Sequence, residues 1–283
     1  MKHKNILYLL GSGRSGTTLL ATILNSTSKV DTVGELHQFY SHLNDNLKCS
    51  CGKFVTECGF WQQVLSHLKI DNKTIERFVI NQNKEEEHKH IPFLLLGKKA
   101  SYDYIESQER LFNAIGAFKN EWILDSSKYV GRFLLLSQIK SLNVKGIYVV
   151  RDIRGVVNSF NKQVQTPKKP ISTIFYYLLT NTFAQLICWL DKGVIKLRYE
   201  DLVDNPHQAI ENIYISLLKA EEININLNEA FDVPHIIGGN RLKRNKTITI
   251  KKDMEWKQNI SRFNQIIYYF LCLPFMLINR YKI

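Results

Sequence analysis

A glycine-rich loop directly after an apolar run constrains the fold of this chain more than any other feature. The run Leu7–Leu10 leads into Gly11–Gly16, which holds three glycines in six positions, and an apolar helical pattern begins at Leu19. This order predicts a buried strand, a tight turn and the start of a helix. Glycines let the backbone approach a ligand closely, and the N–H groups of a helix start favour a phosphate or sulfate. We therefore expect an anion-binding loop over Gly11–Thr18.

The loop differs from a nucleoside-triphosphate loop at a decisive position. Gly11 and Gly16 have the G-x-x-x-x-G spacing of such loops, but Thr17 stands where the phosphate-reaching lysine belongs. We also find no obvious acidic residue at the end of a strand that would hold Mg²⁺. Arg14 adds a fixed positive charge. The loop therefore predicts a ligand whose 5′-phosphate carries something other than a γ-phosphoryl group.

Strand-like runs alternate with helical patterns along most of the chain. An opening strand, loop and helix cover about Ile6–Asn25, and further strands are expected at Lys29–Leu36, Trp122–Leu124, Val144–Val150 and Val194–Tyr199. The alternation predicts an α/β fold with a P-loop-like central parallel sheet of about four to five strands flanked by helices. Because 45% of the residues are hydrophobic and 23% are charged, the composition is that of a globular protein. We expect one domain over residues 1–283.

Two helical regions stand outside this alternation. Residues 60–118 read as a mainly helical insertion on the acceptor side, interrupted by the polar run Asn81–His90, which we expect to be a solvated linker. An apolar helix is expected at about 255–279. No segment reaches the ~18–20 apolar residues of a membrane span, and Ile266–Ile278 comes closest. We expect the C-terminal helix to pack on the core, with membrane contact through residues 266–283 as the alternative.

A second basic motif follows the clearest strand of the chain. Arg151 comes directly after Val144–Val150, and Ser159 lies eight residues further on, in a helical pattern. In open parallel sheets, ligands bind at the carboxyl ends of the strands. A guanidinium and a hydroxyl at such an end can converge on one phosphate.

Together, the two motifs resemble the sulfotransferase family that uses 3′-phosphoadenosine-5′-phosphosulfate (PAPS), including its bacterial members and its carbohydrate and tyrosylprotein sulfotransferases. The glycine loop is similar to the family's 5′-phosphosulfate loop, and the Arg–Ser pair to its 3′-phosphate motif. Three supporting stretches also agree with the family pattern: Asp125–Lys128, Leu197–Leu202 and His235–Arg244. The resemblance covers residues 6 to about 244. It implies PAPS as the donor, adenosine 3′,5′-bisphosphate as the product and no metal requirement.

The resemblance also implies which residues bind the donor. These are the loop residues, the Arg–Ser pair and the late basic loop: Gly11, Ser12, Gly13, Arg14, Ser15, Gly16, Thr17, Thr18, Arg151, Ser159, Asn240, Arg241 and Arg244. Among the basic residues of the late loop, the one that would hold the 3′-phosphate stays open. No residue is assigned to a metal.

Catalysis would need a base for the acceptor hydroxyl and donors for the charge that develops as the S–O bond breaks. Glu35 is our choice of base, because tyrosylprotein and related sulfotransferases place a catalytic Glu in a similar Gly-Glu pair. His37 competes with it, since both side chains lie on one face of an extended segment. The loop amides, Arg14 and Thr17 are the candidate donors, and the resemblance adds Lys128 or Ser127 as a contact to the sulfate or the bridging oxygen. The acceptor would be a saccharide, a glycolipid or another hydroxyl compound, bound by the region Phe60–Phe118 and the loop Gln163–Pro170.

Three of the five cysteines, Cys49, Cys51 and Cys58, fall within ten residues. Metal binding, a redox pair and simple packing are the alternatives, and we favour packing or a local disulfide. Zinc would need a fourth ligand, for which His42 or His67 are candidates.

The formal net charge of +12 suits an acidic ligand or an anionic surface. The basic residues form no nucleic-acid-binding signature, so we expect no nucleic acid partner. With no secretory signal visible, we expect a cytoplasmic protein, peripheral to the inner membrane if the C-terminus touches lipid. A P-loop phosphotransferase and a non-catalytic binder of anionic polymers are the alternative functions.

Overall fold

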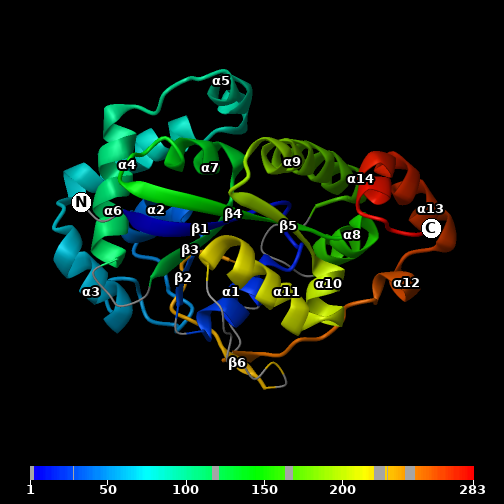
Figure 1. Cartoon of the computed structure of the whole chain (residues 1–283). Coiled ribbons are helices and arrows are strands. Elements are labelled where there is room, and N and C mark those ends of the chain that lie inside the picture. The colour runs from blue at the N-terminus through cyan, green and yellow to red at the C-terminus, as the bar shows by residue number, and fades with distance from the viewer. Residues whose placement is uncertain are drawn as a thin grey trace.

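A five-stranded parallel sheet forms the centre of the molecule (Figure 1). The computed structural model describes residues 3–27, 29–116, 121–162, 168–219, 227, 229–239 and 246–283. The strand order is β2–β3–β1–β4–β5, with bounds β1 Lys4–Leu10, β2 Val30–Gly34, β3 Trp122–Lys128, β4 Leu142–Val150 and β5 Val194–Arg198. The predicted α/β class and strand number are confirmed. Because all five strands are parallel, their carboxyl ends lie at one edge.

Both faces of the sheet are covered by helices, which explains why Ile6–Leu10 of its central strand form a continuous apolar, buried run. Ile6, Tyr8 and Leu10 pack into one hydrophobic cluster, and Leu7 and Leu9 into the other. One face carries α1 Thr17–Asn25, α10 Tyr199–Asp204 and α11 Pro206–Ile213. The opposite face carries α2 Phe39–Asn44, α7 Val130–Leu136, α9 Pro170–Leu190 and the helical insertion. Such double coverage is typical of parallel sheets.

The helical insertion contains α3 Gly59–Leu68, α4 Asn72–Glu85, α5 Ile91–Leu95 and α6 Tyr102–Ile115. The prediction of a solvated linker over Asn81–His90 is wrong, because α4 continues through the first half of that run. Gln82 and Glu86 are buried, and Glu86 accepts a hydrogen bond from Arg132 Nη1 at 2.6 Å. Glu86 thus pairs with a buried arginine, which the sequence pattern alone does not reveal, whereas residues 83, 84 and 87–89 of the run are exposed.

Three short helices replace the single C-terminal helix that the sequence predicts. They are α12 Trp256–Asn259, α13 Arg262–Leu271 and α14 Leu273–Ile278. Pro274 lies in the first turn of α14, where its missing N–H costs no helical hydrogen bond, so the chain breaks between α13 and α14. These helices form a hydrophobic cluster with α8 Ile153–Asn161 and the first half of α9.

Helix α9 has 21 residues and is apolar enough to cross a membrane by length and composition, which the sequence analysis did not anticipate. In the fold it packs on β4 and β5, and 44% of its most apolar 18-residue stretch is buried. Core helices of soluble proteins satisfy the same criteria.

A short segment after the main sheet extends the β2 edge. Strands β6 Phe231–Asp232 and β7 Thr247–Ile248 pair antiparallel. Between them, Ile237 pairs with Gly34 in a parallel bridge: Ile237 N donates to Val33 O at 3.1 Å and Glu35 N donates to Ile237 O at 2.8 Å. The segment therefore lies against the end of β2.

Candidate active site

The loop between β1 and α1 requires glycine at two positions. Gly11 has φ +122°, and a Cβ there would lie 2.2 Å from Val149 O; Gly16 has φ +91°, and a Cβ would lie 2.5 Å from Tyr199 Cδ2. Side chains rarely adopt such backbone conformations, and neither position has room for one. The loop is therefore held tightly between the ends of β4 and β5.

Several polar groups of this loop are hydrogen-bonded within the protein. Ser12 and Ser15 are buried and hydrogen-bond each other, Oγ to Oγ at 2.8 Å, so both hydroxyls serve the loop itself. Gly13 N donates to the hydroxyl of Tyr176 at 3.0 Å, a contact that the sequence analysis missed. Helix α1 then begins without a side-chain cap or an acidic residue in its first turn. An anion at this position would meet backbone N–H groups and the positive end of the helix dipole.

Arg14 joins the two basic motifs that the sequence predicts. Its Nε donates to Ser159 Oγ at 3.0 Å, and its carbonyl oxygen accepts from Arg151 Nη1 at 3.2 Å. Arg14 also has φ +70°, a conformation that costs a non-glycine residue free energy and tends to occur at functional sites. The glycine loop and the Arg–Ser motif are therefore neighbours, close enough to bind one nucleotide.

Arg151 is buried and held by two further residues. Its guanidinium stacks over the ring of Tyr199 at 4.2 Å and forms an ion pair with Asp253 at 3.2 Å. Asp253 also lies 3.7 Å from Lys162. Burial raises the pKa of the Asp253 carboxyl, but the attraction of Arg151 and Lys162 outweighs it and leaves the pKa below its usual value. Asp253 carries no sequence signal, and its carboxylate pairs with the guanidinium of Arg151.

Glu35 and Lys128 form an ion pair across the cleft floor. Lys128 Nζ lies 2.6 Å from Glu35 Oε1 and also donates to Ser126 O at 2.7 Å. Gln38 Nε2 donates to the second oxygen of Glu35 at 3.1 Å. Like Arg14, Lys128 has a positive φ, of +69°. Arg14 in the glycine loop and Lys128 at the end of β3 thus both line the cleft from strained backbone positions.

His37 lies two residues from Glu35 in a different environment. Its ring stacks on Tyr129, with centroids 4.4 Å apart, and Tyr129 stacks on His88 at 5.1 Å. Burial and the nearby Lys128 charge lower the pKa of His37 to about 3. Its ring is therefore neutral near pH 7, and a base with so low a pKa attracts a proton weakly. Glu35 and His37 therefore lie in different environments: Glu35 pairs with Lys128, and the His37 ring stacks on Tyr129.

A cleft of about 1280 Å³ brings the four predicted catalytic residues together with part of the glycine loop. Gly13, Arg14, Thr17, Glu35, His37 and Lys128 line it. Arg151 and Ser159 lie behind Arg14 and do not line the cleft. Asn240, Arg241 and Arg244 lie outside the described residues, but Gly238, Gly239 and Lys246 on either side of them line it.

The expected acceptor side is only partly found in this cleft. From the described residues 60–116 only His88 lines it, and from the described part of the loop Gln163–Pro170 only Lys168 does. The stretch Leu47–Gly52 contributes instead. The helices of the insertion mainly bury their apolar faces in the core, which leaves them little surface to offer the cleft.

A buried charge network supports the cleft floor. Arg132 is fully buried and pairs with Asp125 at 2.8 Å and with Glu86 at 2.6 Å. Asp125 in turn accepts from the hydroxyl of Ser127, whose oxygen accepts from His37 N at 3.0 Å. The network therefore links the helical insertion and β3 to the backbone beside Glu35.

The cysteine cluster differs from its expected form. All five cysteines are free thiols, so no local disulfide forms. The histidine beside Cys49, Cys51 and Cys58 is His235, not His42 or His67. The spacing of the residues in the sequence does not identify His235 as a neighbour of the cysteines, because it lies 177 residues from Cys58.

Residues 7–217 match the model of the family described as "Sulfotransferase family". No curated protein matches the chain. Among solved structures, the sulfotransferase domain from the curacin biosynthetic pathway shares 18% identity with a TM-score of 0.49, covering 79% of this chain and 76% of that one. The sulfotransferase domain of the Synechococcus PCC 7002 olefin synthase shares 20% identity with a TM-score of 0.48, covering 80% and 77%. Sulfotransferase STF9 from Mycobacterium avium shares 13% identity with a TM-score of 0.44, covering 76% and 64%.

The family model spans about three quarters of the chain, from β1 to the helices after β5. The matched stretch contains the glycine loop, the Glu35–Lys128 pair and the Arg–Ser motif, which the fold brings to one edge of the sheet. On that match, this chain belongs to the sulfotransferase family.

Proposed function

We propose that this protein transfers a sulfuryl group from PAPS to a hydroxyl of a carbohydrate or glycolipid. The observation that carries the proposal is the placement of Glu35 and Lys128 in the same cleft as the glycine loop and Arg14. This arrangement sets a proton acceptor and a cationic donor beside an anion-binding helix start. An acceptor hydroxyl and an activated sulfuryl group could meet there.

The residues present fit the donor at both of its anionic ends. Loop amides after Gly13 and the start of α1 suit the 5′-phosphosulfate, and no P-loop lysine is needed for it. Arg151 and Ser159 suit the 3′-phosphate, with Arg14 between the two groups. The donor supplies a sulfuryl group already attached to a good leaving group. For Arg151 to bind a phosphate, Asp253 must give up its place beside the guanidinium.

In the proposed reaction Glu35 accepts the proton of the acceptor hydroxyl as the oxygen attacks sulfur. Lys128 and Arg14 stabilise the negative charge that develops on the transferred group and on the leaving oxygen. Gln38 and Lys128 hold the Glu35 carboxylate through both of its oxygens, which fixes its direction. His37, neutral and stacked on Tyr129, lines the acceptor side.

A saccharide acceptor suits the chemistry of the cleft walls. Tyr129, Tyr176 and Phe160 present aromatic rings there, and Gln38 and Thr180 add hydrogen-bonding groups. Aromatic faces with a few polar groups are typical of binding sites for small molecules with mixed surfaces.

The C-terminal helices suggest where the acceptor is met, and we propose that they touch an anionic membrane. Phe270, Leu271 and Leu277 are 53–60% exposed, and the basic residues Arg280 and Lys282 follow them. An apolar face next to basic residues is typical of interfacial helices. Such contact would bring a glycolipid acceptor near the enzyme.

Incubation with ³⁵S-labelled PAPS and a panel of saccharides, glycolipids and tyrosine peptides tests the function directly. Label should move to a saccharide or glycolipid without added Mg²⁺, and adenosine 3′,5′-bisphosphate should inhibit. Transfer from ATP–Mg²⁺ in place of PAPS would instead support a phosphotransferase. Salt-sensitive polymer binding without nucleotide affinity would support a non-catalytic binder.

A further inference from the structure

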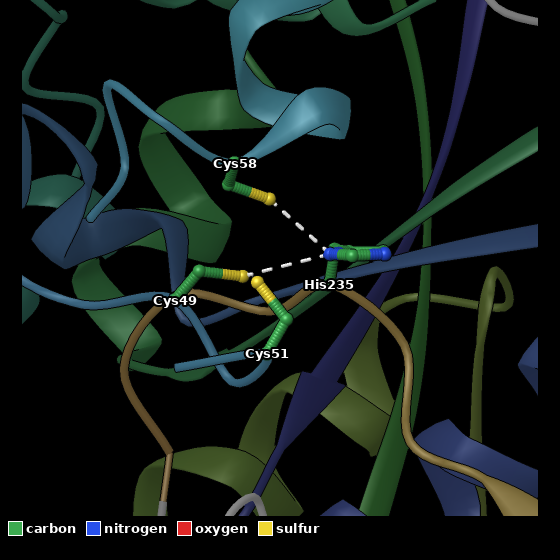
Figure 2. A group of neighbouring side chains, drawn as sticks. All are labelled: Cys49, Cys51, Cys58 and His235. Carbon is green, nitrogen blue, oxygen red and sulfur yellow. Dashed lines mark hydrogen bonds between the residues drawn. The ribbon is translucent and has the colours of Figure 1, made fainter. Parts of the chain in front are cut away.

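Three thiols and one imidazole converge beside the cleft in a way that the sulfuryl-transfer site does not use. Figure 2 shows the sulfur atoms of Cys49 and Cys58 turned toward the ring of His235, with the sulfur of Cys51 beside that of Cys49. The four potential ligand atoms all lie within 4.8 Å of one another. His235 Nδ1 lies 3.2 Å from Cys58 Sγ and 3.9 Å from Cys49 Sγ.

The backbone around the thiols is built to bring them together. Cys49 N donates to Lys53 O at 2.9 Å and Gly52 N donates to Cys49 O at 3.0 Å, which closes a tight turn over Cys49–Lys53. Gly52 has φ +87° in this turn. Cys58 sits directly before α3 and donates its N–H to Phe54 O at 2.9 Å. Two thiols on a turn and a third at a helix start can therefore face one point.

His235 is presented to the same point by an independent set of contacts. Its ring stacks on Phe60, with centroids 6.1 Å apart and planes 13° apart. The hydroxyl of Ser50 donates to Pro234 O at 2.6 Å and accepts from Ile236 N at 3.0 Å. The residues on both sides of His235 are thus bound to the turn between Cys49 and Cys51.

The donor set matches one class of metal ion. Three thiolates and an imidazole nitrogen are the ligands of closed tetrahedral zinc sites, with Zn–S of about 2.3 Å and Zn–N of about 2.0–2.1 Å. Those bond lengths place tetrahedral sulfur ligands about 3.8 Å apart, so the observed spacing needs only a small contraction. Hard cations such as Mg²⁺ prefer oxygen ligands, which this cluster lacks. Packing alone does not explain the cluster, because Cys51 is exposed.

We propose that Cys49, Cys51, Cys58 and His235 bind one zinc ion with a structural role. With four protein ligands the ion has no open position, so it takes no part in the transfer reaction. It fastens the turn over Cys49–Lys53, which lines the cleft, to the segment that carries His235. That segment continues to Ile237, which accepts the hydrogen bond of Glu35 N. The zinc ion thus holds one wall of the cleft against the strand end that presents Glu35.

Metal analysis of the untagged full-length protein, purified without added metals or chelators, tests the proposal. We expect about one zinc ion per chain. Cys58→Ser and His235→Ala should each lose most of it, whereas Cys188→Ala, at a cysteine outside the cluster, should keep it. Less than about a fifth of an equivalent of zinc in the wild type, or equal zinc in all variants, would overturn the proposal.

A second measurement covers the case in which the cluster variants fail to fold. Stepwise modification of the wild-type thiols by a mercurial, with a chromogenic chelator present, should release the zinc as the three cluster thiols react. Cobalt(II) exchanged into the site should give a thiolate-to-metal charge-transfer band and tetrahedral ligand-field bands. A chain mass two hydrogens lower under non-reducing conditions, without zinc, would show a disulfide instead and refute the proposal.

Discussion

Lys128 Nζ lies 2.6 Å from Glu35 Oε1, so the ends of adjacent strands β3 and β2 are joined by an ion pair within the candidate active site. Both side chains are about 15% exposed, and both line the cleft. An acceptor hydroxyl that approaches Glu35 therefore also approaches the lysine charge. The pair gives the clearest test of the proposed mechanism.

Glu35→Gln should abolish most turnover while leaving nucleotide binding intact. The amide keeps the size of the side chain but cannot accept the acceptor's proton, and general-base catalysis contributes about 10²–10⁴-fold. Rates of labelled sulfate transfer, with adenosine 3′,5′-bisphosphate affinity by calorimetry, check this. Glu211→Gln, on the exposed side of α11, is the matched control and should be unaffected. Wild-type turnover in Glu35→Gln would assign the base role elsewhere.

Arg151→Ala should weaken adenosine 3′,5′-bisphosphate binding by about 10- to 100-fold, since hydrogen bonds to charged groups contribute about 1.5–3 kcal/mol. Asp253→Asn should strengthen binding, because it removes the carboxylate that competes for the same guanidinium. Calorimetric titration of both variants checks the pair, with Arg262→Ala at an exposed helix end as the control. Weaker binding by Asp253→Asn would mean that Asp253 positions Arg151 and does not compete for it.

These residues also mark how far the sequence predicts the site. The strands, the glycine loop and the Arg151–Ser159 motif could be predicted, because each depends on residues that are close together in the sequence. Asp253 and His235 reach their partners from distant parts of the chain, so no spacing rule finds them. Gln82 and Glu86 were predicted to be solvated, because a buried polar residue with a distant partner looks the same in sequence as an exposed one. The break before α14, by contrast, was signalled by Pro274.

His37 should destabilise the fold at acid pH. Its folded-state pKa of about 3 lies below the ordinary value of 6.5, so the unfolded chain binds the proton more tightly. The contribution of the neutral ring to the free energy of unfolding is complete above pH 6.5. It is lost as the pH falls toward 3, and the free energy of unfolding then decreases by up to about 1.4 kcal/mol per pH unit. Urea denaturation between pH 4 and 8 should show a shallower pH dependence in His37→Asn than in the wild type. His67→Asn, at an exposed histidine, should behave like the wild type; an equal slope in His37→Asn would contradict the prediction.

Arg132→Met should lower the free energy of unfolding by about 3–5 kcal/mol, because it leaves the buried carboxylates of Asp125 and Glu86 without their counter-charge. The exposed pair of Arg110 and Glu106 gives the control, and Arg110→Met should cost no more than about 1 kcal/mol. Chemical denaturation measures both. If the two variants lose the same small amount, the buried network does not stabilise the fold as proposed.

Residues 266–283 should bind vesicles that contain anionic lipid. Leu277 is 60% exposed on α14, so Leu277→Asp should leave the fold intact while removing apolar contact and adding charge repulsion. The wild type should sediment with vesicles of phosphatidylcholine and phosphatidylserine, and less so as salt rises, since each basic residue near such a surface contributes about 1 kcal/mol. Ile80→Asp, an equally exposed apolar site on α4, should bind as the wild type does. Equal loss in both variants would mean that the attraction is not localised to the C-terminal helices, and no sedimentation of the wild type would remove the membrane from the proposed function.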